Sequence, residues 1–291
     1  MVLIKGKVIR KIQGFYDVLC EKGIYSCKLK GILKKSNNKL NCVIGDIVDF
    51  DIDDLVINNI YDRKNLLLRP LVANVDFVAI TLSVKDPVID INNFQKMLLL
   101  IDKQEIPLIL ILSKIDLVDE DEKTKMLNEL NDRFRNIKIF CISLKTKEGL
   151  LELEKYIEGK QIVLSGASGV GKSSLVNYLL KDDVLEVGDI SSKTKKGKNT
   201  TIDTRYFETD QIKIFDTPGY SYVSVPEFYD KLDIMAYISE FKPYLGLCKF
   251  KNCIHIDEPQ CYIKQMVIED KINIKRYDFY KSLVNEYVNK K

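Results

Sequence analysis

The sequence predicts a mixed α/β protein built in three parts. Short β-type runs fill the first 64 residues, strands and helices alternate from residue 77 to residue 180, and a Cys/His cluster interrupts a helical C-terminal region. The first pattern is typical of a small barrel, and the second of a parallel sheet covered by helices. A chain of 291 residues is long enough for several compact units. We therefore expect three domains, at residues 1–66, 67–224 and 225–291.

The N-terminal part holds five β-type runs separated by Gly and Asn/Asp turns: Leu3–Ile12, Phe15–Cys20, Ile24–Leu29, Asn41–Phe50 and Leu55–Tyr61. Five short strands at this spacing predict a barrel, and the OB-fold is one topology that such a barrel can adopt. Residues 1–40 carry ten Lys or Arg and only two Asp or Glu, although the whole chain has a net charge of just +3. This excess of positive charge indicates contact with a polyanion, with a solvated basic face as the alternative.

The central part alternates apolar runs with segments of helical periodicity. The expected strands are Phe77–Val84, Pro107–Leu112, Ile137–Ser143 and Gln161–Leu164, followed by Arg205–Glu208 and Gln211–Phe215. The expected helices are Asn92–Glu105, Asp121–Arg135, Gly149–Glu158 and Gly171–Leu180. Residues 182–202 are polar and Lys-rich with no apolar period, which predicts a loop.

The composition is that of an ordinary globular protein, with 46% hydrophobic and 30% charged residues. The longest apolar runs are too short to span a bilayer, and the first residues lack the apolar core of a secretory signal. We therefore expect a cytoplasmic protein that does not bind membranes, and a monomer.

A phosphate-binding loop is the strongest motif. Residues 166–173 fit the pattern G-x-x-x-x-G-K-[ST], after an apolar strand and at the start of a helix. Backbone N–H groups and the helix N-terminus can surround phosphates, Lys172 adds a full positive charge, and the Ser173 hydroxyl can bind Mg²⁺. The candidate phosphate-binding residues are Gly166, Ala167, Ser168, Gly169, Val170, Gly171, Lys172, Ser173 and Ser174.

A second phosphate-side motif, Asp216-Thr217-Pro218-Gly219, follows the expected strand that ends at Phe215. Asp216 at the end of a strand beside the phosphate-binding loop can hold Mg²⁺, and the Gly219 N–H can reach the γ-phosphate. In isolation the same four residues would form a tight turn. With the phosphate-binding loop upstream, we interpret them as part of the nucleotide site.

Two further segments predict which base is bound. Ser113-Lys114-Ile115-Asp116 follows a buried strand and resembles the guanine-reading pattern [NT]-K-x-D, in which the Asp carboxylate accepts hydrogen bonds from the ring N1–H and the exocyclic amine. Adenine offers no such pair of donors, so Asp116 favours GTP over ATP. Ser143-Leu144-Lys145 ends another strand and would meet the guanine O6 through a backbone N–H. Because Ser113 stands where Asn is usual, we expect weaker support of the phosphate-binding loop.

These motifs occur in a rotated order. Here the base-reading segments at 113 and 143 precede the phosphate-binding loop and D-x-P-G, whereas ordinary GTPases have them last. The order predicts a circularly permuted GTPase domain, in which the chain after Gly219 runs directly into the C-terminal region. A γ-phosphate-sensitive segment would thus be covalently joined to that region.

The chain resembles the RsgA family (also called YjeQ or EngC) of small-subunit ribosome biogenesis GTPases. The resemblance is carried by the motifs above, by the Cys/His cluster, and by segments 67–70, 72–76 and 197–201. It implies an N-terminal OB-fold, a permuted GTPase centre, a zinc-bearing C-terminal domain and GTP hydrolysis stimulated by the small ribosomal subunit. Thr200 or Thr201 would bind Mg²⁺ in the GTP state.

The chain departs from the family pattern G-R-H-T-T at Asn199, where the family has His. Tyr220 stands where many GTPases have a Gln that orients water. Lys172, Asp216, Gly219, Thr200 and Thr201 are then the candidate catalytic residues. We expect slow intrinsic hydrolysis that depends on a group or ordering supplied by a partner.

Three cysteines and the only histidine of the chain form the pattern Cys248-x4-Cys253-x-His255-x5-Cys261. Three thiolates and one imidazole make a complete tetrahedral set for a structural Zn²⁺, with buried thiols as the alternative interpretation. Basic residues around the cluster suit contact with an RNA backbone: Lys249, Lys251, Lys271, Lys275 and Arg276.

Two other functions stay open at this stage. One is a nucleotide-binding RNA scaffold that barely hydrolyses GTP, which the departures at Asn199 and Ser113 would permit. The other is an ATPase, which Asp116 disfavours. The favoured partners are GTP or GDP with Mg²⁺, one structural Zn²⁺, and the small ribosomal subunit with its RNA.

Overall fold

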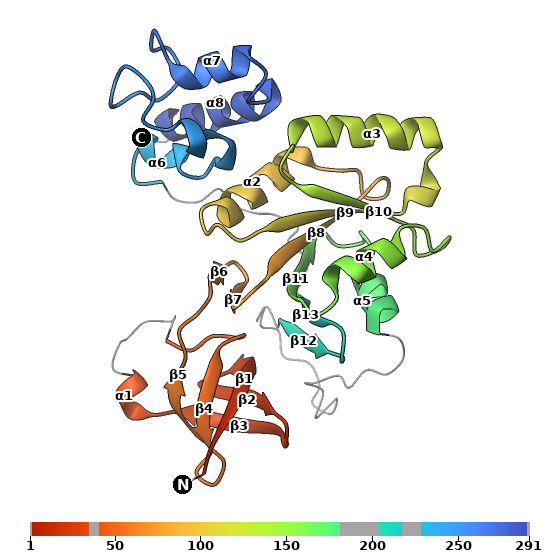
Figure 1. Cartoon of the computed structure of the whole chain (residues 1–291), viewed down its shortest axis with the longest axis vertical. Helices are drawn as coiled ribbons and strands as arrows, with labels where there is room; N and C mark the ends of the chain where they lie inside the picture. The colour runs from red at the N-terminus through yellow and green to blue at the C-terminus, as the bar shows by residue number, and fades with distance from the viewer. Residues whose placement is uncertain (1, 35–40, 181–203, 217–227, 290–291) are drawn as a thin grey trace.

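The computed structural model describes residues 2–34, 41–180, 204–216 and 228–289. Its first element is a closed barrel of five strands, β1 (Leu3–Ile12), β2 (Phe15–Cys20), β3 (Gly23–Leu29), β4 (Ile47–Asp51) and β5 (Val56–Ile60), in the order β1-β2-β3-β5-β4 (Figure 1). The short helix α1 (Gly31–Lys34) follows β3. Alternate side chains such as Val8, Val18 and Phe50 fill the barrel. The predicted OB-type barrel is confirmed, although its fourth strand begins at Ile47 instead of Asn41.

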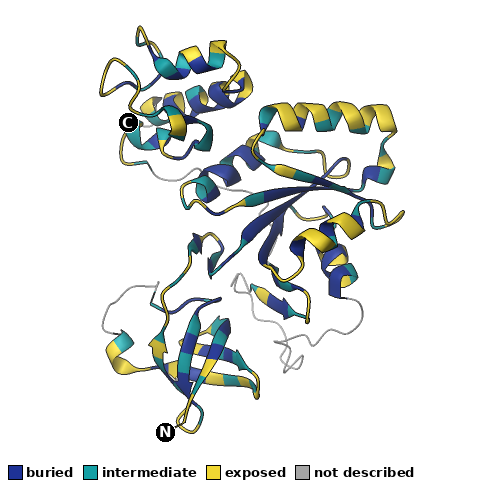
Figure 2. Cartoon of the chain, in the orientation of Figure 1, coloured by how far each residue is buried: buried dark blue, intermediate teal, exposed yellow. Residues whose placement is uncertain are grey.

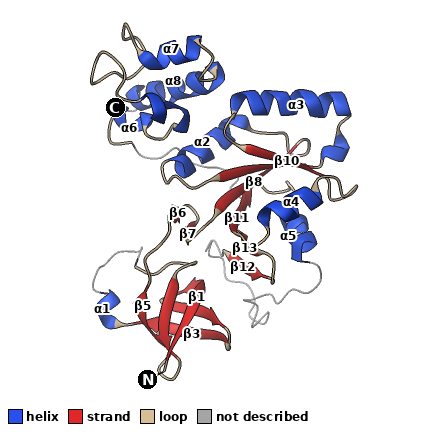
Figure 3. Ribbon diagram, in the orientation of Figure 1, coloured by secondary structure: helices blue, strands red, loops and turns tan. Residues whose placement is uncertain are grey.

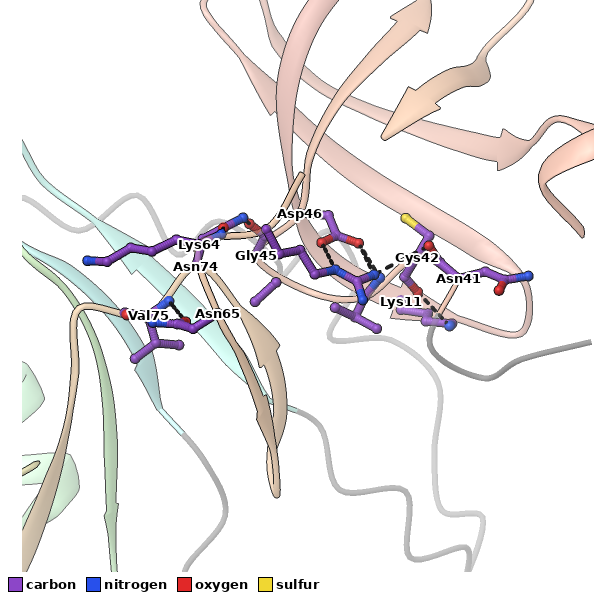
Figure 4. Close-up of polar contacts among 12 residues, drawn as sticks. Lys11, Asn41, Cys42, Gly45, Asp46, Lys64, Asn65, Asn74 and Val75 are labelled. Carbon is purple, nitrogen blue, oxygen red and sulfur yellow. Dashed lines mark hydrogen bonds and ion pairs between the residues drawn. The ribbon is translucent and has the colours of Figure 1, made fainter. Parts of the chain in front are cut away.

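A hairpin that the sequence did not predict joins the barrel to the central sheet. It consists of β6 (Leu66–Leu68) and β7 (Leu71–Ala73). Figure 4 shows the polar contacts at this junction, where Asn74 Nδ2 donates to the Gly45 carbonyl at 2.9 Å. Arg63 also donates to both carboxylate oxygens of buried Asp46, at 2.7 and 2.8 Å. The base of the barrel and the chain that leaves it are thereby fixed to each other.

The central sheet has six strands in the order β10-β9-β8-β11-β13-β12. They are β8 (Phe77–Ser83), β9 (Leu108–Ser113), β10 (Lys138–Ile142), β11 (Gln161–Gly166), β12 (Arg205–Glu208) and β13 (Lys213–Asp216). All are parallel except β12, which pairs antiparallel with β13 at the edge of the sheet. The three strands β8, β9 and β11 in the middle of the sheet are almost wholly buried, as the dark ribbons of Figure 2 show, and therefore read as mostly apolar runs in the sequence.

Helices cover both faces of this sheet (Figure 3). One face packs against α2 (Ile91–Asp102) and α3 (Glu120–Arg133), and the other against α4 (Leu150–Ile157) and α5 (Lys172–Leu180). Asp90 and Asp119 cap α2 and α3 by accepting hydrogen bonds from the backbone N–H of Asn93 and Glu122. The predicted strands and helices are confirmed, with ends that differ by up to three residues from the prediction.

The C-terminal part is helical around a core of its own. It contains α6 (Lys231–Met235), the 3₁₀ helix η2 (Ser239–Tyr244), α7 (Tyr262–Ile268) and α8 (Ile274–Asn289). Leu99 of α2 lies in the same buried cluster as two of its cysteines, so this core also packs against the central part. No helix among the described residues is long and apolar enough to cross a membrane.

Candidate functional site

The predicted nucleotide-binding segments meet at one edge of the central sheet. Because β8, β9, β10, β11 and β13 run parallel, the loops that follow them all emerge at the carboxyl edge. The register places Ser113 beside Ser83, and Leu164 of β11 beside Asp216. Ligands of such sheets bind in this position. The base-side and phosphate-side motifs, far apart in the sequence, therefore share one site.

The phosphate-binding loop has the backbone that its glycines allow. Gly166 has a φ of 145°, and a Cβ there would lie 2.3 Å from the carbonyl oxygen of Thr81 on β8. Gly169 and Gly171 also have positive φ values, of 81° and 95°. The loop then enters α5 at Lys172, with Ser173 and Ser174 exposed in its first turn. A side chain at residue 166 would push β8 and β11 apart, so glycine is required for the loop to leave the sheet here.

Lys172 is buried within this loop. Its Nζ donates to the carbonyl oxygens of Gly166 and Ala167, both at 2.7 Å. Burial lowers the pKa of Lys172, and the nearby carboxylate of Asp216 raises it in opposition. The Lys172 ammonium can therefore replace its hydrogen bonds to carbonyl oxygens by hydrogen bonds to phosphate oxygens. Asp216 is close enough to raise the pKa of Lys172.

Ser113 supports the loop despite its short side chain. Its Oγ lies 2.6 Å from the Val170 carbonyl oxygen and 3.0 Å from the Leu82 carbonyl oxygen. A hydroxyl has one hydrogen, so it can donate to only one of these two acceptors at a time. The contact between Ser113 and the phosphate-binding loop is therefore present, and the weaker support expected from Ser in place of Asn stays a prediction.

Asp116 is oriented by the neighbouring base-side segment. The Ser143 hydroxyl donates to Asp116 Oδ1 at 2.6 Å and itself accepts from the backbone N–H of Lys145 and Thr146, at 3.2 and 3.1 Å. Ile115 is buried and anchors the turn, while Leu144 packs on the α4–α5 face. The two predicted base-reading segments thus form one hydrogen-bonded unit.

Lys114 occupies the left-handed backbone region with a φ of 61°, and its Nζ donates to the carbonyl oxygen of Asp86 in the loop after β8. That loop also approaches the phosphate side, because a Cβ on Gly169 would contact Pro87. No motif in the sequence indicated that residues 86–87 lie against both the base side and the phosphate side of the site. Thr200, Thr201 and Gly219 lie outside the described residues, and Asp216 is the last described residue before Gly219.

The four predicted metal ligands converge on one point. The ligand atoms of Cys248, Cys253, His255 and Cys261 all lie within 4.8 Å of one another. His255 Nδ1 is 3.5, 3.3 and 3.3 Å from the three sulfur atoms, and two of these sulfurs are 3.9 Å apart. Tetrahedral zinc requires N···S and S···S separations of about 3.6 and 3.8 Å. The cluster therefore fits a metal site of the zinc type, with Nδ1 as the imidazole ligand.

The structure corrects one expectation about the basic residues near this cluster. Arg276 is fully buried, and its Nε and Nη2 donate to the two Glu240 oxygens at 2.6 and 3.0 Å. It therefore cannot contact RNA. Lys275 is paired with Glu129 of α3 at 2.8 Å. Sequence spacing placed these residues near the cysteines, but α8 turns them toward the central part.

Sequence reasoning also missed a polar chain on the barrel side. Lys7 Nζ of β1 donates to the Tyr206 hydroxyl at 2.9 Å, and this hydroxyl donates to Glu208 Oε2 at 2.6 Å. Lys7 belongs to the basic N-terminal segment, where nothing in the pattern distinguishes it from solvated lysines. The contact depends on how β1 lies against β12, which the sequence alone does not specify.

The fold and site define a P-loop GTPase whose domain is circularly permuted, because the base-reading strands precede the phosphate-binding strand in the chain while the sheet keeps them together. Sequence comparison gives the family. A model described as RsgA GTPase matches residues 60–226, and one described as RsgA N-terminal domain matches residues 5–56. The chain belongs to the RsgA family of GTPases.

Individual relatives agree with this assignment. A protein of Fusobacterium nucleatum called small ribosomal subunit biogenesis GTPase RsgA is 42% identical over 276 residues, which is 94% of this chain and 96% of the relative. A Clostridium acetobutylicum protein of the same name is 37% identical over 97% of both chains. The crystal structure of YjeQ from Thermotoga maritima matches with a TM-score of 0.78 at 31% identity, covering 99% of each chain. The crystal structure of YloQ, a circularly permuted GTPase, matches with a TM-score of 0.76 at 26% identity, covering 100% of this chain and 96% of that one.

Proposed function

We propose that this GTPase acts on the small ribosomal subunit during its late maturation and hydrolyses GTP to GDP and phosphate when bound to it. The observation that supports this most is the meeting of Lys172, Asp116 and Asp216 at one sheet edge, in a family whose relatives carry the small subunit in their name.

We assign guanine recognition to Asp116. Its carboxylate accepts from the guanine N1–H and exocyclic amine, and the Ser143 hydroxyl at 2.6 Å keeps it in place for that role. The stem of Lys114 covers the base plane, and a backbone N–H of segment 143–145 meets the guanine O6. An adenine ring would leave the buried side of Asp116 without donors, which costs binding free energy.

We assign phosphate binding to the loop from Gly166 to Ser174. The backbone N–H groups surround the β-phosphate, and the Lys172 ammonium contacts the β- and γ-phosphates. The Ser173 hydroxyl and the Asp216 carboxylate are hard oxygen donors of the kind that Mg²⁺ prefers, and Thr200 or Thr201 would complete the set. When bound, Mg²⁺ supplies positive charge that offsets the charge developing on the transferred phosphoryl group.

Asn199 has no imidazole to act as a general base, and Tyr220 stands where many GTPases have a Gln amide that orients water. The proposal therefore includes slow intrinsic hydrolysis and stimulation by the small subunit. In this arrangement the partner contributes order or a catalytic group, and the chain contributes the phosphate and base contacts.

We further propose that the Cys/His cluster holds one structural Zn²⁺ and that the barrel contacts ribosomal RNA. The four ligands leave no open position for catalysis. On the barrel, the exposed ring of Phe15 lies 5.1 Å from Lys28 Nζ, which gives a base a stacking surface beside a cation. Lys249 and Lys251 near the cluster would add phosphate contacts.

The decisive experiment compares GTP hydrolysis by the zinc-loaded protein with and without isolated small subunits, with large subunits as the control. We expect stimulation by small subunits alone, and loss of hydrolysis in Lys172→Ala with the fold retained. The scaffold alternative predicts binding to the small subunit without any rise in turnover. Fast turnover without ribosomes would contradict the proposed role of the partner.

A companion binding experiment tests base recognition. We expect GDP to bind far more tightly than ADP, and Asp116→Ala to remove most of that preference. Removing two charge-assisted hydrogen bonds should weaken GDP binding by about 3 kcal/mol or more, roughly a hundredfold. Tight binding of ADP to the wild-type protein would contradict the guanine assignment.

A further inference from the structure

A single lysine of the barrel reaches the edge of the central sheet. Lys7 projects from β1, and its Nζ donates to the hydroxyl of Tyr206 on β12 at 2.9 Å. Tyr206 is only 2% exposed, and its hydroxyl donates to Glu208 Oε2 at 2.6 Å. Lys213 of β13 lies 3.5 Å from the other Glu208 oxygen. These four residues form a continuous polar chain from the barrel to β13.

Hydrogen-bond chemistry fixes the direction of this chain. An ammonium can only donate and an ionised carboxylate can only accept, so the phenol must accept from Lys7 and donate to Glu208. The Tyr206 hydroxyl therefore connects the cation of the barrel to the anion of the sheet, and the Lys7 Nζ also lies 5.2 Å from the centre of the Tyr206 ring. Burial lowers the pKa of Lys7, and the attraction of Glu208 opposes this shift.

The chain ends next to the nucleotide site. Tyr206 pairs in register with Phe215, and the two rings lie 4.7 Å apart. Phe215 is followed directly by Asp216, the carboxylate assigned to Mg²⁺ and close enough to Lys172 to raise its pKa. Because β12 lies at the edge of the sheet and pairs with β13, Tyr206 is linked through this pairing to the strand that carries Asp216.

An apolar contact would hold the barrel equally well, because buried charges seldom add more stability than packed hydrophobic side chains. A hydrogen bond is directional, so the hydroxyl can be either bonded or released. We propose that Tyr206 is a positioning residue that couples the barrel to the nucleotide site: its hydroxyl, held between Lys7 and Glu208, sets the position of Asp216 according to the position of the barrel. This inference rests on the proposed function for its physiological use.

Coupling of this kind is reciprocal, so the nucleotide must affect the barrel as the barrel affects the nucleotide site. The first test therefore needs no ribosome. Amide hydrogen exchange is measured in β1 of the zinc-loaded full chain, with GDP and with a non-hydrolysable GTP analogue. We expect the wild-type protein to show different protection of β1 in the two states, and Tyr206→Phe to abolish the difference while both states keep the fold.

Tyr61→Phe is the matched control. The Tyr61 hydroxyl donates to Asp49 Oδ1 at 3.1 Å on the outside of the barrel, and the residue is 40% exposed. The substitution removes a phenol hydroxyl, as Tyr206→Phe does, but one that makes no contact with β12. The nucleotide-dependent difference in β1 protection should therefore remain. A difference that survives equally in Tyr206→Phe, or that is absent from the wild-type protein, would overturn the inference.

The second test measures hydrolysis on small subunits. We expect Tyr206→Phe to lower the stimulated kcat by about fivefold or more, with the KM for GTP unchanged, since the hydroxyl positions a group and does not bind the nucleotide. Lys7→Met should give the same result, and Tyr61→Phe should give the wild-type kcat. A rise in KM with kcat unchanged would overturn the positioning role.

The two tests separate this inference from the proposed function. If small subunits fail to stimulate the wild-type protein, the proposed function is wrong, and the exchange experiment still decides whether Tyr206 couples the barrel to the nucleotide. If the Tyr206 variant unfolds, hydrogen exchange and stimulated kcat are both measured on Lys7→Met.

Discussion

The barrel and the C-terminal part are joined to the central part of the molecule in different ways. On the zinc-cluster side, the guanidinium of Arg276 is buried against Glu240, with Asp102 at 4.0 Å, Gln95 at 3.3 Å and the Phe134 ring at 5.5 Å. On the barrel side, one lysine donates to a phenol. In the first junction the Arg276 guanidinium is in direct contact with a carboxylate. In the second, the neutral Tyr206 hydroxyl lies between the Lys7 ammonium and the Glu208 carboxylate.

The two junctions also differ in the additional contacts that surround them. Around Arg276, surface pairs add further links between the C-terminal part and α2 or α3, including Lys103 with Asp233 and Lys242 with Glu105. The barrel is tied by polar contacts of the chain that leaves it, at Asp46 and Asn74, and Ile9 of β1 packs into the apolar core of the central sheet. The comparison teaches that this protein fixes one neighbour of its GTPase sheet firmly and connects the other through a contact next to the site.

Metal removal should have the largest effect, and it should be confined to the zinc-cluster side. Structural zinc contributes about 10–16 kcal/mol of binding free energy to small domains. We expect a chelator to remove exchange protection from α7 and α8 while β1–β5 keep theirs. Cys253→Ser should act like the chelator, whereas Cys20→Ser on the barrel should not. Equal loss of protection in the barrel would contradict the separation of the barrel from the C-terminal part.

Arg276→Met tests the firm junction directly. It leaves the half-buried carboxylates of Glu240 and Asp102 without their counter-charge, which should lower the free energy of unfolding by about 3 kcal/mol. Lys275→Met is the control on the same helix. Because its partner Glu129 is exposed, we expect a loss of at most about 1 kcal/mol. Denaturant titration measures both, and similar losses would show that the buried position of Arg276 has no special role.

Asp102→Asn should change how stability depends on pH. Burial, with a smaller contribution from the charge of Glu240, raises the pKa of Asp102 from 3.8 to about 6. Between these values the folded state holds a proton that the unfolded state has released, so the free energy of unfolding falls as pH rises through this window. The variant should lack this slope and be about 1–3 kcal/mol more stable at pH 7. Identical slopes from pH 4 to pH 7 would contradict the shift.

Lys7→Met should have the smallest effect on stability. Methionine can fill the space of the lysine stem, and the phenol keeps its bond to Glu208, so we expect the free energy of unfolding to change by less than about 1 kcal/mol. This small value contrasts with the effect on coupling proposed above. A loss as large as that of Arg276→Met would mean that both junctions serve mainly for stability.

The motifs assigned to phosphate and guanine binding could be located in the sequence because the proposed chemistry requires particular residues at fixed spacing. Gly166 and Lys172 lie where the pattern placed them, and the four metal ligands converge as their types implied. The alternating apolar runs likewise predicted the buried strands.

The junctions could not be predicted, since they depend on how separate parts pack together. Arg276 was interpreted as an RNA contact because its neighbours in sequence are basic, yet α8 buries it against Glu240. Lys7 and Tyr206 are 199 positions apart, and no local pattern connects them. The β6–β7 hairpin was missed because two three-residue strands give no periodicity to detect.

Fluorescence energy transfer across the two junctions tests the central comparison most directly. One pair of probes, placed by non-natural amino acids, joins exposed Lys22 of the barrel to exposed Leu151 of α4; the other joins Ile268 of α7 to the same Leu151. We predict that exchanging GDP for a non-hydrolysable GTP analogue changes transfer for the barrel pair and leaves the α7 pair unchanged. A change in the α7 pair with a constant barrel pair would contradict the account.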